Sequence, residues 1–113
     1  MKNLSMATNN KTMSSLEIAE LTGKEHKQVL RDIRNMANEL YPNIQGTDLY
    51  LSDLQGFIVE KLDNGFTKQV LLDYSHTQTL ITGYSITLRK KVIDRWQELE
   101  EKQIDPMKAL AHE

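Results

Sequence analysis

The side chains best suited to chemistry gather between residues 24 and 34, a segment with four Lys or Arg residues and two acids. Arginine and lysine suit guanine edges, glutamine suits adenine edges, and cationic side chains attract phosphates. The segment therefore predicts contact with double-stranded DNA. The residues expected to make that contact are Lys24, His26, Lys27, Gln28, Arg31 and Arg34.

Two helices are expected to hold these side chains. Ser14 and Glu17 have the S-x-x-E spacing of a capping box, and Gly23 is the residue type that favours a left-handed helix end. A second helix is expected from about Glu25 to about Leu40. Its apolar residues recur at intervals of three and four, as on a buried helix face. They are Val29, Leu30, Ile33, Met36, Ala37 and Leu40.

The spacing of small and apolar residues in these helices fits a helix-turn-helix. Ala19 would let the second helix pack closely, Gly23 tolerates the positive φ of the turn, and Val29 would face inward. Asp32 stands where an apolar residue is more usual, so the match is partial. The alternative is an ordinary pair of helices with a solvated charged face.

A β-hairpin is predicted from residue 57 onward. Asn-Gly between two runs of β-branched and aromatic residues favours a type I′ turn, with strands at 57–62 and 66–72. A short strand or turn near Leu49–Leu51 would precede them. Two helices followed by a hairpin describe a winged helix-turn-helix.

Lysines on both sides of the hairpin turn predict a wing that contacts DNA. These are Lys61 and Lys68. Asp63 at the tip repels phosphate and argues against contact there. The alternative is a hairpin that only covers the core.

The C-terminal part returns to a helical period. Ser75 and Gln78 have the spacing of a second capping box, and this short helix should end at Gly83. A long helix is expected from Ser85 to about Gln103, because Pro106 should end the ordered chain. The chain is therefore expected to be α+β. Its expected parts are a flexible N-terminal arm (1–12), a winged helix-turn-helix domain with a long C-terminal helix (13–103) and a flexible tail (104–113).

The long helix carries two further candidate surfaces. Arg89, Lys90, Lys91 and Arg95 form a second basic cluster that would support phosphate binding, or would simply be a solvated face. Apolar residues farther along predict an oligomerisation face and a homodimer, which would present two recognition helices to a two-fold DNA site. They are Ile93, Trp96 and Leu99. The alternative is a seam within one chain.

Composition argues against several other classes. The chain has no cysteine, and its three histidines, His26, His76 and His112, lack metal-ligand spacing. The sequence has no nucleophile elbow, phosphate loop or HExxH motif. We therefore expect that the protein is not an enzyme and binds neither a metal nor a cofactor. No apolar run is long enough to span a membrane, which predicts a cytoplasmic protein. The net charge of −2 argues mildly against nucleic acid, although the acids gather towards the C-terminus.

Two stretches resemble a known family. "MSSLEIAELTGKEHKQVLRDIRNM" resembles the opening of the Rha family of phage regulatory proteins. The matching residues there are Ser15, Ile18, Ala19, Thr22, Gly23, Lys24, His26, Val29, Arg31, Asp32 and Ile33. "YSHTQTLITGYSITLRKKVIDRWQELE" resembles a segment of phage antirepressor-like proteins. The matching residues there are Leu80, Gly83, Tyr84, Arg89, Val92, Arg95, Trp96, Leu99 and Glu100.

The resemblance covers roughly residues 13–101. It implies a phage or prophage regulator with a winged-helix DNA-binding fold, acting in the cytoplasm of a bacterial host. The alternative is an antirepressor that binds and sequesters a repressor protein. A third interpretation is a scaffold protein that oligomerises through the helix that carries Trp96.

Overall fold

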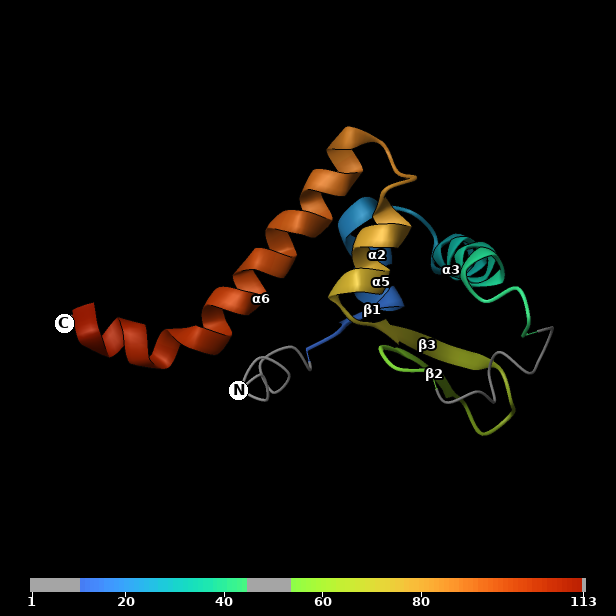
Figure 1. Cartoon of the computed structure of the whole chain (residues 1–113), viewed down its shortest axis with the longest axis horizontal. Helices are drawn as coiled ribbons and strands as arrows, with labels where there is room; N and C mark the ends of the chain where they lie inside the picture. The colour runs from blue at the N-terminus through green and yellow to red at the C-terminus, as the bar shows by residue number, and fades with distance from the viewer. Residues whose placement is uncertain (1–10, 45–53, 113) are drawn as a thin grey trace.

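A computed structural model describes residues 11–44 and 54–112 of the chain, with the backbone alone from residue 102 onward. In this part the protein is α+β, as predicted, with four helices and one three-stranded antiparallel sheet (Figure 1). The elements are β1 (Met13–Ser14), α2 (Ser15–Thr22), α3 (His26–Leu40), β2 (Phe57–Lys61), β3 (Thr67–Leu72), α5 (Tyr74–Ile81) and α6 (Ile86–His112). The strand expected near Leu49–Leu51 and residues 1–10 of the expected arm lie outside the described residues.

The two helices expected from the N-terminal pattern are confirmed. The Ser14 hydroxyl accepts a hydrogen bond from the Glu17 backbone N–H at 3.1 Å, which caps α2. Gly23 ends α2 in the left-handed conformation that is common at helix ends. Its N–H donates to the Ala19 carbonyl at 2.9 Å. Three residues then lead to α3, which buries Val29, Ile33 and Ala37 along one stripe.

The hairpin is confirmed, but the expected type I′ turn is wrong. That turn needs a positive φ at Asn64 as well as at Gly65. Gly65 has a positive φ, whereas no described non-glycine residue has one. The Gly65 N–H donates to the Leu62 carbonyl at 2.9 Å, and the Leu62 N–H donates to the Phe66 carbonyl at 2.8 Å. This is the longer loop in which a left-handed glycine follows a type I turn.

A short strand that the sequence pattern did not indicate completes the sheet. β1 pairs antiparallel with β3, so the strand order is β1-β3-β2. Its two residues directly precede α2, and two residues carry no detectable alternation. Met13 is fully buried opposite Leu72, and Phe57 lies opposite Leu72 from the other side.

Both C-terminal helices differ from the expected boundaries. α5 begins earlier, because the Asp73 carboxylate, not Ser75, caps it by accepting from the His76 N–H at 2.9 Å. α6 continues to His112, past the end expected at Gln103. Pro106 was expected to stop it, but a proline within a helix can bend it instead. The C-terminal, red part of α6 indeed changes direction in Figure 1.

The core lies between the sheet and the helices. α2 and α5 pack on β3, α6 packs on α2 and α5, and α3 packs on α2 and α5. Figure 1 shows α3 and the tip of the hairpin at one end of the long axis, and the C-terminal part of α6 at the other. The buried apolar residues include Ile18, Val29, Ile33, Phe57, Val70, Leu72, Ile81, Val92 and Trp96.

Candidate nucleic-acid interface

The outward face of α3 is cationic. Lys27, Arg31 and Arg34 are exposed, and they recur at intervals of four and three, so they share one side of the helix. Val29 and Ile33 point the opposite way into the core. The Lys27 ammonium lies near the Glu25 carboxylate, but both side chains are largely solvated. Such an exposed ion pair is weak. Three of the six expected contact residues are therefore displayed to solvent together.

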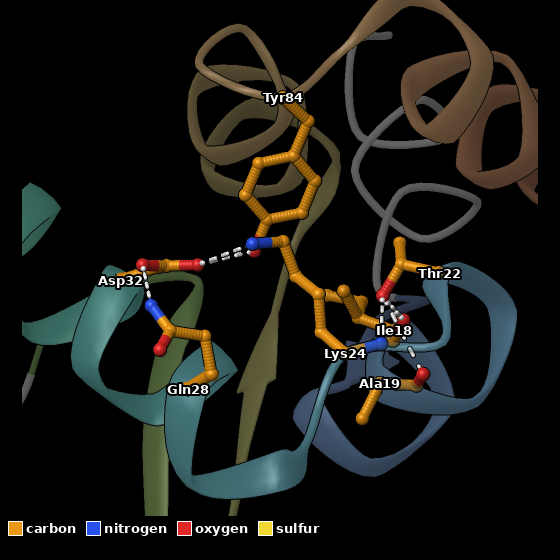
Figure 2. A network of polar contacts seen from close by, with 7 residues as sticks. All are labelled: Ile18, Ala19, Thr22, Lys24, Gln28, Asp32 and Tyr84. Atoms are coloured by element: carbon orange, nitrogen blue, oxygen red, sulfur yellow. Dashed lines mark hydrogen bonds and ion pairs between the residues drawn. The ribbon is translucent and has the colours of Figure 1, made fainter.

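The turn between α2 and α3 is held by backbone and hydroxyl groups. Thr22 Oγ1 donates to the Ile18 carbonyl at 2.8 Å and accepts from the Lys24 N–H at 3.3 Å (Figure 2). Gly23 supplies the left-handed conformation that other residues rarely adopt. This short connection fixes where the cationic face of α3 points relative to the rest of the fold.

His26 is held against the neighbouring helix. Its Nε2 lies 2.8 Å from the hydroxyl of Ser15, a fully buried residue, and that hydroxyl accepts the Val70 N–H at 3.0 Å. Burial lowers the pKa of His26, so the neutral ring is favoured. The ring thus joins the starts of α2 and α3 to β3. The sequence predicts that His26 contacts DNA, whereas in the structure its ring contacts Ser15 and so connects α3 with α2 and β3.

Lys24 and Gln28 are joined to a polar network that the sequence pattern did not reveal. Asp32 Oδ1 accepts from Gln28 Nε2 at 3.1 Å, and Asp32 Oδ2 accepts from the Tyr84 hydroxyl at 3.0 Å (Figure 2). The Lys24 ammonium lies 3.6 Å from Asp32 Oδ2 and 4.7 Å from the centre of the Tyr84 ring. Burial, and then the Asp32 charge, raise the pKa of Tyr84, so its hydroxyl remains a donor.

This network supplies partners for Asp32 at the position where the sequence pattern led us to expect an apolar residue. Its carboxylate fastens the residues just before α6 to the middle of α3, across 52 positions of sequence. Tyr84 lies in the Thr-Gly-Tyr segment that precedes α6. Of the two stretches that resemble known phage proteins, the second therefore supplies the hydrogen-bond partner of Asp32, which lies in the first.

The hairpin tip carries both charge and apolar surface. Lys61 and Lys68 are exposed on either side of it, and Asp63 is exposed at the turn. Side chains alternate along a strand, so Lys68 projects from the same sheet face as Val70, the face that the helices cover. Phe66 is 71% exposed, which is unusual for a phenylalanine that serves only the core.

The basic cluster on α6 is partly neutralised. Lys90 Nζ pairs with Asp94 at 2.7 Å, while Lys91 is exposed. Arg89 is half-buried, and its Nε, which solvent does not reach, has no hydrogen-bond partner among the described residues. α6 packs against α2 and α5, so this cluster belongs to another element than the cationic face of α3.

The three residues expected at an oligomer interface belong to the core of a single chain. Trp96 is only 3% exposed, its ring lies 5.5 Å from that of Tyr74, and Ile93 and Leu99 pack partly buried against the same core. The indole N–H donates to Glu100 at 3.1 Å. Trp96 therefore packs between helices of one chain, which is the alternative given in the sequence analysis.

A hydrogen-bonded chain at the far end of α3 was also missed. His76 is buried and bonds Asp73 through Nδ1 at 2.8 Å and the Tyr41 hydroxyl through Nε2. Burial and the Asp73 charge raise the pKa of Tyr41, so its hydroxyl donates to the ring. The D-x-x-H spacing at a helix cap was the available sequence signal. This series of hydrogen bonds connects the end of α3 to the start of α5.

Among the described residues, no group of three or more acids or histidines could hold a metal ion. In the same part of the chain, no helix is both long and apolar enough to cross a membrane.

Comparison with known proteins gave one match. A family model described as phage regulatory protein Rha matches residues 13–101, which is most of the chain. Searches of curated proteins and of solved structures returned no match.

Proposed function

The chain belongs to the family of the phage regulatory protein Rha, and from this premise we propose that it regulates transcription by binding double-stranded DNA through a winged helix-turn-helix. The single observation that carries the proposal is the exposed cationic face of α3, made by Lys27, Arg31 and Arg34. A recognition helix presents such a face to the major groove, with its first turns nearest the base edges.

The order of elements supports the winged form. β1, α2, α3, β2 and β3 follow one another along the chain, and β1 pairs with β3 so that the hairpin extends one sheet. The three-residue link between α2 and α3 has the length and the glycine of a helix-turn-helix. The tip of the hairpin and α3 lie at the same end of the molecule, as a wing and its recognition helix would (Figure 1).

The proposed roles differ between the candidate residues. Lys27, Arg31 and Arg34 would contact DNA directly, and Lys61 and Lys68 would meet phosphates beside the groove. Lys24 and His26 are held by Asp32 and Ser15, so they would act first by shaping α3, whereas Gln28 is held by Asp32 but would still meet a base. Arg89 and Lys91 remain candidates for phosphate support from α6, and Lys90 is the weaker candidate because Asp94 pairs with it.

A homodimer would present two copies of α3 to a two-fold operator, which multiplies specificity. Because Trp96 is buried within one chain, the proposed dimer contact lies elsewhere on the surface. The proposed place of action is the cytoplasm of a bacterial host, where phage DNA is transcribed.

Selection of bound sequences from a random duplex pool tests the proposed function. The purified protein is expected to enrich one short sequence and to shift that duplex at low salt. Failure to retain any duplex at low ionic strength would refute DNA binding, because electrostatic attraction is strongest there.

A second candidate function is that of an antirepressor that binds a repressor protein. The observation that favours it is apolar surface on the hairpin, where Ile58, Leu62 and Phe66 are 48%, 46% and 71% exposed. Exposed apolar patches often mark protein contacts. Purified repressor of the same phage would then bind the wild type and the Arg31→Ala variant equally, whereas Phe66→Ser would weaken binding.

A further inference from the structure

We infer that Asp32 is a positioning residue that fixes the side-chain amide of Gln28 in the orientation needed to read an adenine. The inference rests on the proposed function, because it assigns a base to one residue of α3. It goes beyond that function by naming which neighbour sets the choice of base. The inference is carried by the i, i+4 hydrogen bond between Gln28 and Asp32, together with the hydrogen bond that the Tyr84 hydroxyl donates to the other oxygen of Asp32.

Asp32 is itself held in one orientation. Its Oδ2 accepts from the Tyr84 hydroxyl at 3.0 Å and lies 3.6 Å from the Lys24 ammonium. The Tyr84 hydroxyl reaches Oδ2 from the α5–α6 connection and the Lys24 ammonium reaches it from the turn between α2 and α3, as Figure 2 shows. The other oxygen, Oδ1, is left to face Gln28. The carboxylate side chain is only 21% exposed, so water competes weakly for it.

A carboxylate only accepts hydrogen bonds, so the group that Gln28 turns towards Asp32 must be its NH2. The amide oxygen of Gln28 then points away from Lys24 and Tyr84 (Figure 2). One N–H and the amide oxygen remain available in a fixed order. This donor and acceptor pair matches adenine, whose N7 accepts and whose N6 donates in the major groove.

The position of Gln28 suits this role. It lies in the first turn of α3, beside the exposed Lys27 and one turn before the exposed Arg31. The hydrogen bond to Asp32 supports its side chain. Because Gln28 is also partly exposed, its amide is accessible to DNA bound at the cationic face of α3. An amide that rotates freely would present its donor and acceptor in either order and would have to be ordered on binding.

The expected effects are measured as ratios of Kd between two duplexes that differ at one base pair. A bidentate glutamine–adenine contact gives a preference of about 5- to 150-fold, and ordering one side chain in advance accounts for roughly 2- to 10-fold of it. Removal of a negative charge strengthens binding to every duplex, but that general effect cancels in the ratio.

The test begins with the duplex that the wild-type full chain selects. Gln28→Ala is expected to abolish the preference for adenine at one position and to leave other positions unchanged. Asp32→Asn, which keeps the shape, should lose about 2- to 10-fold of the same preference. Tyr84 and Lys24 would hold the single oxygen of the new amide, so its NH2 would face Gln28 and turn that amide around.

A double-mutant cycle separates positioning from a general structural role. In a Gln28→Ala background, Asp32→Asn is expected to leave every base preference unchanged. A loss of preference that is equally large without the glutamine would overturn the inference, as would an unchanged preference in Asp32→Asn. Asp32→Ala serves as a second variant, with thermal unfolding to verify that each protein is folded.

The outcomes distinguish the inference from the function on which it rests. If the wild type binds selected duplexes and no position depends on Gln28, the inference fails and the proposed function stands. If the wild type retains no duplex at low salt, the proposed function fails and takes the inference with it.

Discussion

The Tyr84 hydroxyl donates a hydrogen bond to Asp32 at 3.0 Å and so fastens the residues before α6 to the middle of α3. Asp32 also accepts from Gln28, on the side of α3 where the cationic face begins. The connection between α5 and α6 therefore supports the helix that is proposed to enter DNA, although it does not belong to that helix.

Removal of this hydroxyl is expected to destabilise the fold. Tyr84→Phe should lower the free energy of unfolding by about 1–3 kcal/mol, because a hydrogen bond to a charged, half-buried acceptor is lost. Urea denaturation measures this loss. Tyr74→Phe, at an exposed tyrosine, is the matched control and should leave stability almost unchanged. Equal losses in both variants would contradict the role given to Tyr84.

Two glycines with positive φ are expected to respond differently to alanine. Gly65 has open space around it, so Gly65→Ala should cost only about 1–2 kcal/mol of backbone strain. A Cβ at Gly56 would collide with the carboxylate of Asp73, and Asp73 caps α5 and bonds His76. Gly56→Ala should therefore cost about 1–3 kcal/mol more. Denaturation midpoints would contradict this if the two variants were equally stable.

The lowered pKa of the partly buried His26 predicts that stability depends on pH. Its pKa is lowered from 6.5 by burial, so the unfolded chain takes up the proton first as pH falls. The contribution of His26 to stability is present above the unfolded pKa and is lost as pH falls through the folded pKa. Unfolding free energies between about pH 7 and about pH 5 should therefore decline less steeply in His26→Gln, which does not titrate, than in the wild type. Equal slopes would count against a lowered pKa at His26.

The burial of Trp96 predicts how its loss depends on protein concentration. Trp96→Phe should destabilise the chain by an amount that stays constant over a roughly 100-fold range of concentration, because the ring packs within one subunit. Thermal unfolding at several concentrations measures this. A loss that grows on dilution would instead place the ring at an interface between subunits.

Local signals in the sequence predicted most of the elements correctly. Gly23 ends α2 and Ser14 caps it, because a cap depends on residues within one turn. The hairpin was found, but its turn type was wrong. The loop is longer than the pattern suggested, and the ladder shifts register between Glu60 and Lys61. The spacing of Ser75 and Gln78 predicts Ser75 as the cap of α5, but Asp73 caps the helix, and both residue types cap helices equally well.

The candidate site was harder to predict, because its differences arise from distant partners. The two basic clusters are similar in sequence, yet only the fold shows that Arg95, in the second cluster, is paired with Glu17, 78 positions away. Lys90 pairs with Asp94 four positions along the same helix, a spacing that the sequence itself contains. Sequence spacing likewise gave no sign that Ser15 would meet His26, or that Tyr84 would meet Asp32. The exposed face of α3 was predictable because it follows from the period of one helix.

The central claim is that the cationic face of α3 binds DNA, and the salt dependence of binding tests it most directly. Kd for one selected duplex is measured over a salt series for the wild type and for a triple variant, Lys27→Ala with Arg31→Ala and Arg34→Ala. The control is Lys90→Ala on α6, because this lysine already pairs with Asp94. The account predicts that the slope of log K on log salt becomes less steep by about 2–3 in the triple variant, since each phosphate contact contributes about 0.9, and changes by less in the control. A triple variant that binds with the affinity and slope of the wild type would contradict the account.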